Sequence, residues 1–302
     1  MKQTHRPVLQ SQVIEYLSPQ KGDSYLDATA GYGGHAIQVL TKIGPEGRAI
    51  LIDRDQNAVN FLQKKNSGEN IEIIQSDFLA ATKKLQDRGE GFDIILLDLG
   101  VSSPQLDNEV RGFSFRSDIR PDMRMDQTGQ LSAYEVVNDY SLKKLEYVIK
   151  AYGEEPRARK IAQSIVKSRP ITSNVELANA VAKATKGTKK IHPATRTFQA
   201  IRIEVNDEIN QLEKTLPIVA DLLRPNGRLV IVSFHSLEDR VVKQQINRLT
   251  KNCICPLEQP ICTCNKKANF CKITKKVVKG ALLDINNPRA RSAKLRAIRK
   301  LT

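Results

Sequence analysis

The stretch Asp27-Ala-Thr-Ala-Gly-Tyr-Gly-Gly-His35, followed about twenty residues later by Asp53, decides the fold. Gly31, Gly33 and Gly34 predict a tight turn, because glycine adopts positive φ without strain and lets a ligand approach the backbone. Asp53 ends an apolar run, where a carboxylate can accept hydrogen bonds from ribose hydroxyls. A glycine turn and an acid after consecutive strands predict an open α/β sheet that binds a ligand at the carboxyl ends of its strands.

Strand-like and helix-like segments alternate around this turn. Apolar runs predict strands at residues 25–26, 49–52, 71–74, 92–97, 228–232, 273–278 and 293–297. Helices are expected at residues 8–17, 36–43, 58–62, 79–85, 209–223 and 236–249, with a turn at Pro225-Asn226-Gly227 and a capping box at Ser236 and Asp239. Short apolar strands separated by helices imply a mostly parallel sheet covered on both faces. The sequence therefore predicts a doubly wound α/β fold with a seven-stranded sheet.

The alternation stops between the fourth and fifth predicted strands. Residues 102–125 are polar and predict a long loop. Helices are expected at residues 142–152, 156–167, 175–184 and from 194 onward, with Ser173 and Glu176 spaced as a capping box. We therefore predict two domains: residues 1–104 with 208–302 form the α/β domain, and residues 105–207 form an inserted all-helical domain.

The charge of the chain favours a polyanionic partner. Its 302 residues carry a formal net charge of +15, which raises the local concentration of nucleic acid. No run of eighteen apolar residues predicts a membrane span, and no apolar signal region follows the first six residues. The sequence therefore predicts a cytoplasmic protein without a membrane partner.

The residue before the glycine turn separates two kinds of cofactor. A dinucleotide fingerprint reads G-x-G-x-x-G and places a pyrophosphate on a helix N-terminus. Here Asp27 stands directly before the turn, where its carboxylate would repel a pyrophosphate but suit the cationic end of S-adenosylmethionine. The alternative is a tight turn whose aspartate is satisfied by the protein itself. Asp77-Phe78 leaves a similar choice between an adenine contact and a loop acid beside a core aromatic.

The segment after the fourth predicted strand offers acceptors for a reacting amine. The exocyclic amine of a base is a poor nucleophile, because its lone pair is delocalised into the ring. Hydrogen-bond acceptors that hold the amine protons let the nitrogen attack a methyl group. Asp98, Ser102 and Ser103 are the candidate catalytic residues of this kind. A lone aspartate at a strand end can equally be structural.

Arginines and aromatic residues alternate in the predicted loop. Arg111, Phe113, Phe115 and Arg124 are candidate substrate contacts, because aromatic and guanidinium planes stack on splayed RNA bases. An aromatic cluster that fastens the loop to the core would leave the same pattern. His5 and His235 are further candidates for the same cleft, His235 because it follows the fifth predicted strand.

From end to end the chain resembles the bacterial small-subunit (16S) ribosomal RNA cytosine-N4 methyltransferase family. The strings that carry the resemblance are His5-Arg-Pro-Val-Leu9, Asp27 to His35, Ile52-Asp-Arg-Asp55, Asp98 to Asp107, Arg111 to Phe115, Asp122 to Asp126, His192 to Ala200, Ser233 to Arg240 and Asn287-Pro-Arg-Ala-Arg-Ser292. One string departs from the family: Asp118-Ile-Arg-Pro-Asp-Met-Arg124 stands where the family usually reads Asp-Gly-Pro-Leu-Asp-Met-Arg. The departure puts the loop conformation before Asp122 in doubt.

The resemblance implies a Rossmann-like methyltransferase sheet and an RNA-recognition role for the helical domain. It also implies methyl transfer from S-adenosylmethionine to N4 of a cytidine in the decoding (P-site) region of 16S rRNA in the small ribosomal subunit. The implied cofactor contacts are Gly33, Gly34, His35, Asp53, Phe78, Asp98 and Gln105, to which the glycine-turn argument adds Asp27 and Gly31. A homodimer is left open. The competing functions are a non-catalytic ribosome-assembly factor and a nicotinamide dehydrogenase.

All five cysteines lie between Cys253 and Cys271. Four thiolates suffice for a closed zinc site, but the two C-x-C pairs lack the commoner C-x-x-C spacing. A reduced, metal-free loop is therefore the first expectation, and zinc is the alternative. The basic residues beyond Lys272 predict a phosphate-contacting or merely solvated face.

Overall fold

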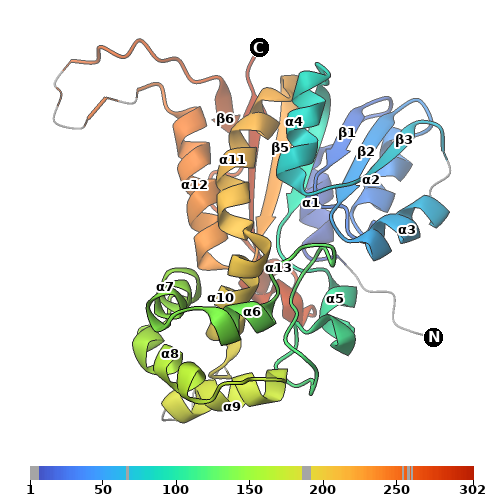
Figure 1. Cartoon of the computed structure of the whole chain (residues 1–302). Helices are drawn as coiled ribbons and strands as arrows, with labels where there is room; N and C mark the ends of the chain where they lie inside the picture. The colour runs from blue at the N-terminus through green and yellow to red at the C-terminus, as the bar shows by residue number, and fades with distance from the viewer. Residues whose placement is uncertain (1–6, 66–67, 186–191, 254, 257–258, 260) are drawn as a thin grey trace. The chain divides into compact units, whose positions relative to one another are not determined.

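The computed structural model describes residues 7–65, 68–185, 192–253, 255–256, 259 and 261–302 (Figure 1). Its contacts divide the chain into two compact units: unit 1 comprises Met1–Gly100 and Ile209–Thr302, and unit 2 comprises Val101–Glu208. The predicted α/β class with a mostly parallel sheet is confirmed. The sheet has eight strands rather than the expected seven.

The sheet of unit 1 runs in the order β3-β2-β1-β4-β5-β8-β6, with β7 paired to β8. Its strands are β1 (Ser24–Asp27), β2 (Arg48–Asp53), β3 (Ile71–Gln75), β4 (Phe92–Asp98), β5 (Leu223–Ser233), β6 (Phe270–Lys272), β7 (Val278–Lys279) and β8 (Lys294–Lys300). The first five strands pair in parallel, whereas β8 is antiparallel to β5. The strand order reverses between β1 and β4, which is the switch point where such sheets bind ligands.

Helices supply the apolar cover of this sheet. They are α1 (Gln10–Leu17), α2 (Ala36–Ile43), α3 (Gln56–Lys65), α4 (Phe78–Asp87), α11 (Glu208–Asp221) and α12 (Ser236–Thr250), with the 3-10 turn η2 (Pro288–Ser292). The short helix α13 (Gly280–Leu283) leaves Leu282 and Leu283 exposed. Two buried clusters lie on the two faces of the strands, one with Leu26 and Ile50 and the other with Tyr25 and Leu51. Neighbouring strand residues point to opposite faces, so the central strands β2 and β4 are apolar on both, whereas β8 alternates apolar residues with lysine and arginine.

Unit 2 is helical. It contains α5 (Ser103–Asp107), the 3-10 turn η1 (Glu109–Arg111), α6 (Ala133–Asp139), α7 (Leu142–Gly153), α8 (Ala158–Lys167), α9 (Asn174–Ala184) and α10 (Thr195–Asn206). A third buried cluster joins these helices through residues such as Val136, Ile161 and Ile201. The expected capping box of α9 is confirmed, because Ser173 Oγ accepts from the backbone N of Glu176 while the Glu176 carboxylate accepts from the backbone N of Ser173.

Two predicted segments of unit 1 were wrong in detail. Of the expected strand 273–278, only Val278 lies in a strand, as the first residue of β7; residues 273–277 separate β6 from β7, and there the Thr274 hydroxyl and backbone bind across to Ala297. The capping box of α12 begins one residue earlier than expected. His235 is the N-cap and Glu238 its partner, whereas Asp239 binds Lys294 and Arg296 at 2.8 Å each.

Two further predictions missed local structure. The expected turn at 225–227 lies inside β5 as an irregularity, with Asn226 at a φ of 65° and a shift of register against β4. The segment 102–125 is not a continuous loop, because α5 and η1 form within it. Helix α6 lies in the predicted all-helical domain, but no separate helix was expected at its residues. No helix in the described part of the chain is long and apolar enough to cross a membrane.

Candidate active site and nucleic-acid interface

Three aspartates end three neighbouring strands of unit 1. Asp27 is the last residue of β1, Asp53 of β2 and Asp98 of β4. Strand β1 pairs with both others, so the three acids gather at the carboxyl edge beside the switch point. The sequence placed all three there, since parallel strands end at the same edge.

Asp27 is enclosed by its own turn. Its side chain is 1% exposed, its Oδ2 accepts from the Tyr25 hydroxyl at 2.7 Å and its Oδ1 accepts from the backbone N of Thr29 at 3.1 Å. Burial raises the pKa of Asp27 to about 6, against the lowering effect of these hydrogen bonds. The structure thus gives Asp27 the internal partners of the structural alternative, and a contact with a ligand stays a prediction.

Asp53 braces the glycine turn from the neighbouring strand. Its Oδ2 accepts from the backbone N of Gly31 at 2.7 Å, and its Oδ1 accepts from the backbone N of Asp55 at 2.8 Å. Burial raises the pKa of Asp53 to about 6. Gly33 adopts a φ of 77°, and a Cβ there would stand 2.9 Å from Leu62 Cδ2. The turn therefore requires glycine both for its backbone conformation and for space.

His35 and Asp98 face each other at the switch point. His35 Nε2 lies 3.5 Å from Asp98 Oδ2, which is long for a hydrogen bond. The His35 side chain is 5% exposed and that of Asp98 is 25% exposed. Asp98 Oδ1 and both ring nitrogens of His35 are buried without a hydrogen-bond partner among the described residues. Such orphaned groups point to a polar ligand, because leaving them unpaired is costly.

The charge of His35 depends on its two acidic neighbours. Burial lowers the pKa of His35, but the carboxylates of Asp98 and Asp27 outweigh it, so the pKa stands above the usual 6.5. The backbone N of Asp98 donates to Thr29 Oγ1 at 2.6 Å, which ties the end of β4 to the glycine turn. The site thus combines a poised histidine with a carboxylate that keeps one oxygen uncommitted.

Two other sequence candidates in unit 1 have structural roles. Asp77 caps α4, its Oδ1 accepting from the backbone N of Ala80 at 2.8 Å, while Phe78 packs against the core. This favours the alternative of a loop acid beside a core aromatic. His235 caps α12, and its Nε2 lies 3.0 Å from Glu238 Oε1. Substrate contact by His235 stays a prediction. His5 lies outside the described residues.

Ser102, Ser103 and Gln105 begin unit 2, directly after the strand end that carries Asp98. Gln105 is buried, and its Oε1 accepts from the backbone N of Ser102 at 3.0 Å. This contact fixes the start of α5, whose first residue is Ser103. The cofactor role of Gln105 and the catalytic roles of the two serines stay predictions.

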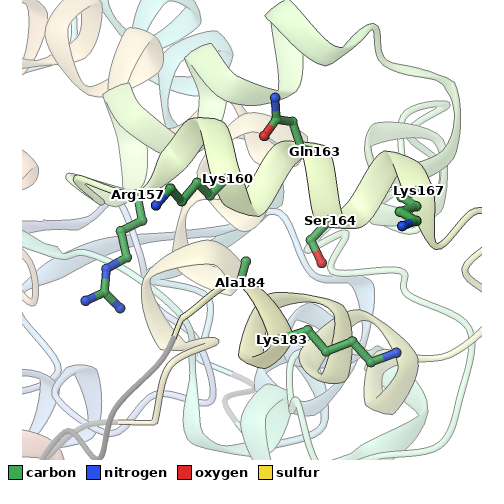
Figure 2. Close-up of a pocket in the computed structure, with 7 residues that line it drawn as sticks. All are labelled: Arg157, Lys160, Gln163, Ser164, Lys167, Lys183 and Ala184. Carbon is green, nitrogen blue, oxygen red and sulfur yellow. The ribbon is translucent and has the colours of Figure 1, made fainter.

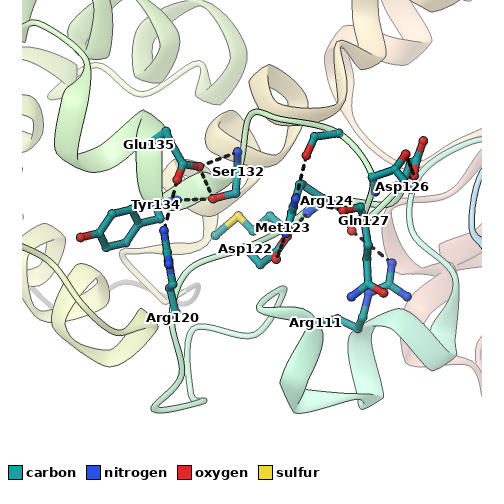
Figure 3. Close-up of polar contacts among 12 residues, drawn as sticks. Arg111, Arg120, Asp122, Met123, Arg124, Asp126, Gln127, Ser132, Tyr134 and Glu135 are labelled. Atoms are coloured by element: carbon teal, nitrogen blue, oxygen red, sulfur yellow. Dashed lines mark hydrogen bonds and ion pairs between the residues drawn. The ribbon is translucent and has the colours of Figure 1, made fainter.

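The predicted arginine contacts are engaged within the protein. We call residues 111–131 the arginine loop (Figure 3). Arg111 is buried and its Nη2 donates to the carbonyl oxygens of Arg124 and Met125 at 3.1 and 2.8 Å. Arg124 pairs with Asp122 at 2.7 Å and donates to the carbonyl oxygens of Gln127 and Gly129. Both guanidinium groups hold the loop together, so their contact with RNA stays a prediction.

The aromatic residues of this loop belong to the protein's own packing. Phe113 is buried in the core of unit 2, which favours the alternative that an aromatic cluster fastens the loop. Phe115 stacks on His192 with ring centroids 4.3 Å apart and packs edge-on against Phe198. Arg120, within the string that departs from the family, lies 3.9 Å above the Tyr134 ring and 3.2 Å from Glu135. These contacts place Arg120 against α6, in the loop whose conformation the sequence left in doubt.

A basic groove between α8 and α9 was missed from the sequence (Figure 2). It is a cavity of about 510 Å³ lined by Arg157, Lys160, Gln163, Ser164, Lys167, Lys183 and Ala184, with no acidic residue. Three of its lysines, Lys160, Lys167 and Lys183, form no ion pair with any described residue. A signal was present: residues 157, 160 and 167 recur at the spacing of one helix face. The two helices are tied by Ser164 Oγ, which donates to the carbonyl oxygen of Ala180 at 2.6 Å.

The model of the MraW methylase family matches residues 2–301. This chain belongs to the MraW methylase family. It is a methyltransferase. The matched residues include Asp27, Asp53 and Asp98 at the strand ends. The ribosomal RNA small subunit methyltransferase H of Geobacter sulfurreducens is 45% identical, over 99% of both chains. The protein of that name from Trichlorobacter lovleyi is also 45% identical, over 98% of both chains. Membership of this family contradicts the dehydrogenase alternative.

Proposed function

We propose that this MraW-family methyltransferase transfers a methyl group from S-adenosylmethionine to N4 of a cytidine in the P-site region of 16S rRNA. The observation that carries the proposal is Asp98, which ends β4 at the switch point with one buried oxygen unpartnered. Full-length relatives named as ribosomal RNA small subunit methyltransferases support the substrate class. We expect the protein to act in the cytoplasm; a homodimer remains an untested prediction.

The residues around the glycine turn fit S-adenosylmethionine. The turn at Gly31 to Gly34 leaves the backbone bare, and Asp53 can accept ribose hydroxyls through the lone pairs that its two backbone contacts leave over. Asp27 adds negative charge near the turn, which suits a cationic sulfur and opposes a pyrophosphate. When bound, the cofactor supplies an electrophilic methyl group. Both acids have a pKa of about 6, so we expect cofactor affinity to fall as the pH drops through that value.

Asp98 has the chemistry needed at the target base. A carboxylate oxygen that accepts a hydrogen bond from the amine N–H orients the nitrogen. It also increases the electron density on that nitrogen as the nitrogen attacks the methyl group. His35 is the positioning residue in this scheme, since its ring lies 3.5 Å from the other oxygen of Asp98. The proton released by the methylated amine can pass to solvent, so no strong general base is needed.

The basic groove of unit 2 supports the RNA part of the proposal. Phosphates of an RNA backbone are held by arginine and lysine side chains, and most of the binding energy is sequence-independent. The groove offers four cations, from the N-cap of α8, from α8 itself and from α9, and its lining holds no acid that would repel phosphate. We therefore assign an RNA-binding role in unit 2 to this groove, while RNA contact by the arginine loop stays a prediction.

The deciding experiment measures methyl transfer by Asp98→Asn to small ribosomal subunits that lack the mark. We expect the rate to fall on the order of 100-fold, because an amide donates where the reaction needs an acceptor. Mass spectrometry of the digested RNA must find N4-methylcytidine at a P-site position. Asp87→Asn, at the exposed end of α4, is the matched control and should keep the wild-type rate. An unchanged rate for Asp98→Asn, or a methyl group on another atom, would contradict the proposal.

The assembly-factor alternative makes a different prediction. A variant with Asp53→Ala loses the carboxylate that braces Gly31 and should lose cofactor binding. If this variant restored normal subunit assembly in a deletion strain, binding without catalysis would be the essential activity. We expect it to leave the RNA unmethylated and the deletion phenotype uncorrected.

A further inference from the structure

Four cysteines converge in the segment between α12 and β6. The segment covers residues 251–269 and has no helix or strand among its described residues (Figure 1). The Sγ atoms of Cys253, Cys255, Cys262 and Cys264 all lie within 4.8 Å of one another. Individual Sγ–Sγ distances are 4.0 Å for Cys255–Cys262, 3.5 Å for Cys262–Cys264 and 3.8 Å for Cys264–Cys253. The two C-x-C pairs therefore interleave rather than stand apart.

These distances fit one tetrahedral metal ion. A zinc ion with four thiolates at about 2.3 Å requires sulfurs about 3.8 Å apart, close to the spacing observed. The sulfurs are too far apart to be bonded to each other, since a disulfide needs about 2.05 Å, and all five cysteines are free. The geometry points to a structural zinc site formed by Cys253, Cys255, Cys262 and Cys264, and we propose it as new for this protein.

The surroundings of the cluster suit a zinc–thiolate complex, whose net charge is negative. The backbone N of Cys255 donates to Cys253 Sγ at 3.4 Å, a contact that disperses charge from a thiolate. Four thiolates and Zn²⁺ carry a net charge of −2, and residues 251–269 contribute three lysines against one glutamate. Binding releases the thiol protons to solvent, and no oxidant or reductant is needed.

A cross-link by a metal ion would also stabilise this segment. A stretch of this length without regular structure is uncommon in a compact protein unless something fixes it. At its ends it is fastened by Lys266, whose Nζ donates to the carbonyl oxygens of Arg248 and Lys251, and by the backbone N of Ala268, which donates to Asn252 Oδ1. The ion would close the part between these contacts, giving folding energy where none of the described residues of the segment is buried. The site stands apart from the methyl-transfer proposal, whose failure would leave it untouched.

The test is the metal content of the full chain, purified under reducing, anaerobic conditions. We expect one zinc ion per chain in the wild type and none in Cys253→Ser or Cys262→Ser. Cys271→Ser is the matched control, because Cys271 lies in β6 outside the cluster, and it should keep the ion. Wild-type protein without zinc, or equal zinc in all variants, would overturn the proposal.

A second measurement avoids any variant that fails to fold. X-ray absorption at the zinc edge of the wild-type protein should show four sulfur ligands at about 2.3 Å. Nitrogen or oxygen ligands, or two disulfides found by thiol titration of anaerobically prepared protein, would sink the idea. Cobalt substitution should give thiolate-to-metal charge-transfer bands in Cys271→Ser and none in Cys262→Ser.

Discussion

The arginine loop and the basic groove lie in the same helical unit and differ in what their cations contact. In the loop, Arg111 and Arg124 donate to carbonyl oxygens of the protein and to Asp122. In the groove, Lys160 and Lys183 line a cavity without acids. The loop has the sequence pattern typical of RNA contacts, whereas the groove has only charge at helical spacing. The comparison teaches that partners, rather than residue type, decide whether a cation is available to a ligand.

The largest effect is expected at Arg111. Arg111→Ala leaves the carbonyl oxygens of Arg124 and Met125 without their donor, which should lower the free energy of unfolding by roughly 2–4 kcal/mol. Urea unfolding followed by circular dichroism measures this change. Arg116→Ala is the control, because Arg116 is exposed and should change stability by less than about 0.5 kcal/mol. Full stability with lost RNA binding would move Arg111 from the protein's scaffold to its RNA interface.

The groove should respond in the opposite way. Lys160→Ala with Lys183→Ala should weaken RNA binding about 10-fold at low salt and reduce the salt slope by about two, with stability unchanged. Filter binding at several salt concentrations measures both. Lys143→Ala, an exposed lysine on α7, is the matched control. If the double variant bound RNA with the wild-type salt slope, phosphates would not occupy the groove.

An acid titration tests the ion pair between Asp122 and Arg124 in the arginine loop. Burial raises the pKa of Asp122, but hydrogen bonds and the charge of Arg124 outweigh it and hold the pKa below 3.8. A depressed pKa adds stability above the unfolded value that is lost as pH falls through the folded value. Asp122→Asn should therefore be less stable than the wild type at pH 7, and this difference should begin to shrink near pH 4 and close as the pH falls through the folded pKa of Asp122. A difference that stayed constant as the pH was lowered from 7 would mean that the Asp122–Arg124 pair contributes no charge-dependent stability.

The smallest effect is expected at Arg120. This side chain is exposed, so its contacts with Glu135 and the Tyr134 ring should contribute only about 0.5 kcal/mol. Arg120→Ala should thus lower the unfolding free energy by that amount and leave methyl transfer intact. Thermal unfolding at low and high salt measures it, since an ion pair weakens as salt rises. A loss above 2 kcal/mol would make this anchor as important as Arg111.

The local sequence pattern was sufficient to predict the central strands of the sheet. The strands that carry Asp27, Asp53 and Asp98 are short apolar runs, and their ends are readable because burial on both faces demands uninterrupted apolar residues. Pattern failed where long-range contacts decide. The segment 273–278 has a strand-like composition, yet the residues that pair with β8 are 270–272 and 278–279, so only Val278 of the segment lies in a strand. Helix α6 was missed although Ser132 and Glu135 form its capping box, because a helix of seven residues gives little periodicity.

By itself the sequence determined the α/β class, the glycine turn, the three acids at the strand ends and the resemblance to a methyltransferase family. These features depend on neighbouring residues or on strand direction, which a linear pattern records. Only the tertiary structure decided which charged and sulfur groups meet. In the structure Arg111 donates to the carbonyl oxygen of Met125, and Lys160 lines the groove. The Sγ atoms of Cys253 and Cys264 lie 3.8 Å apart. Hydrogen bonds and metal coordination act over a few ångströms in space, and no spacing along the chain fixes those distances.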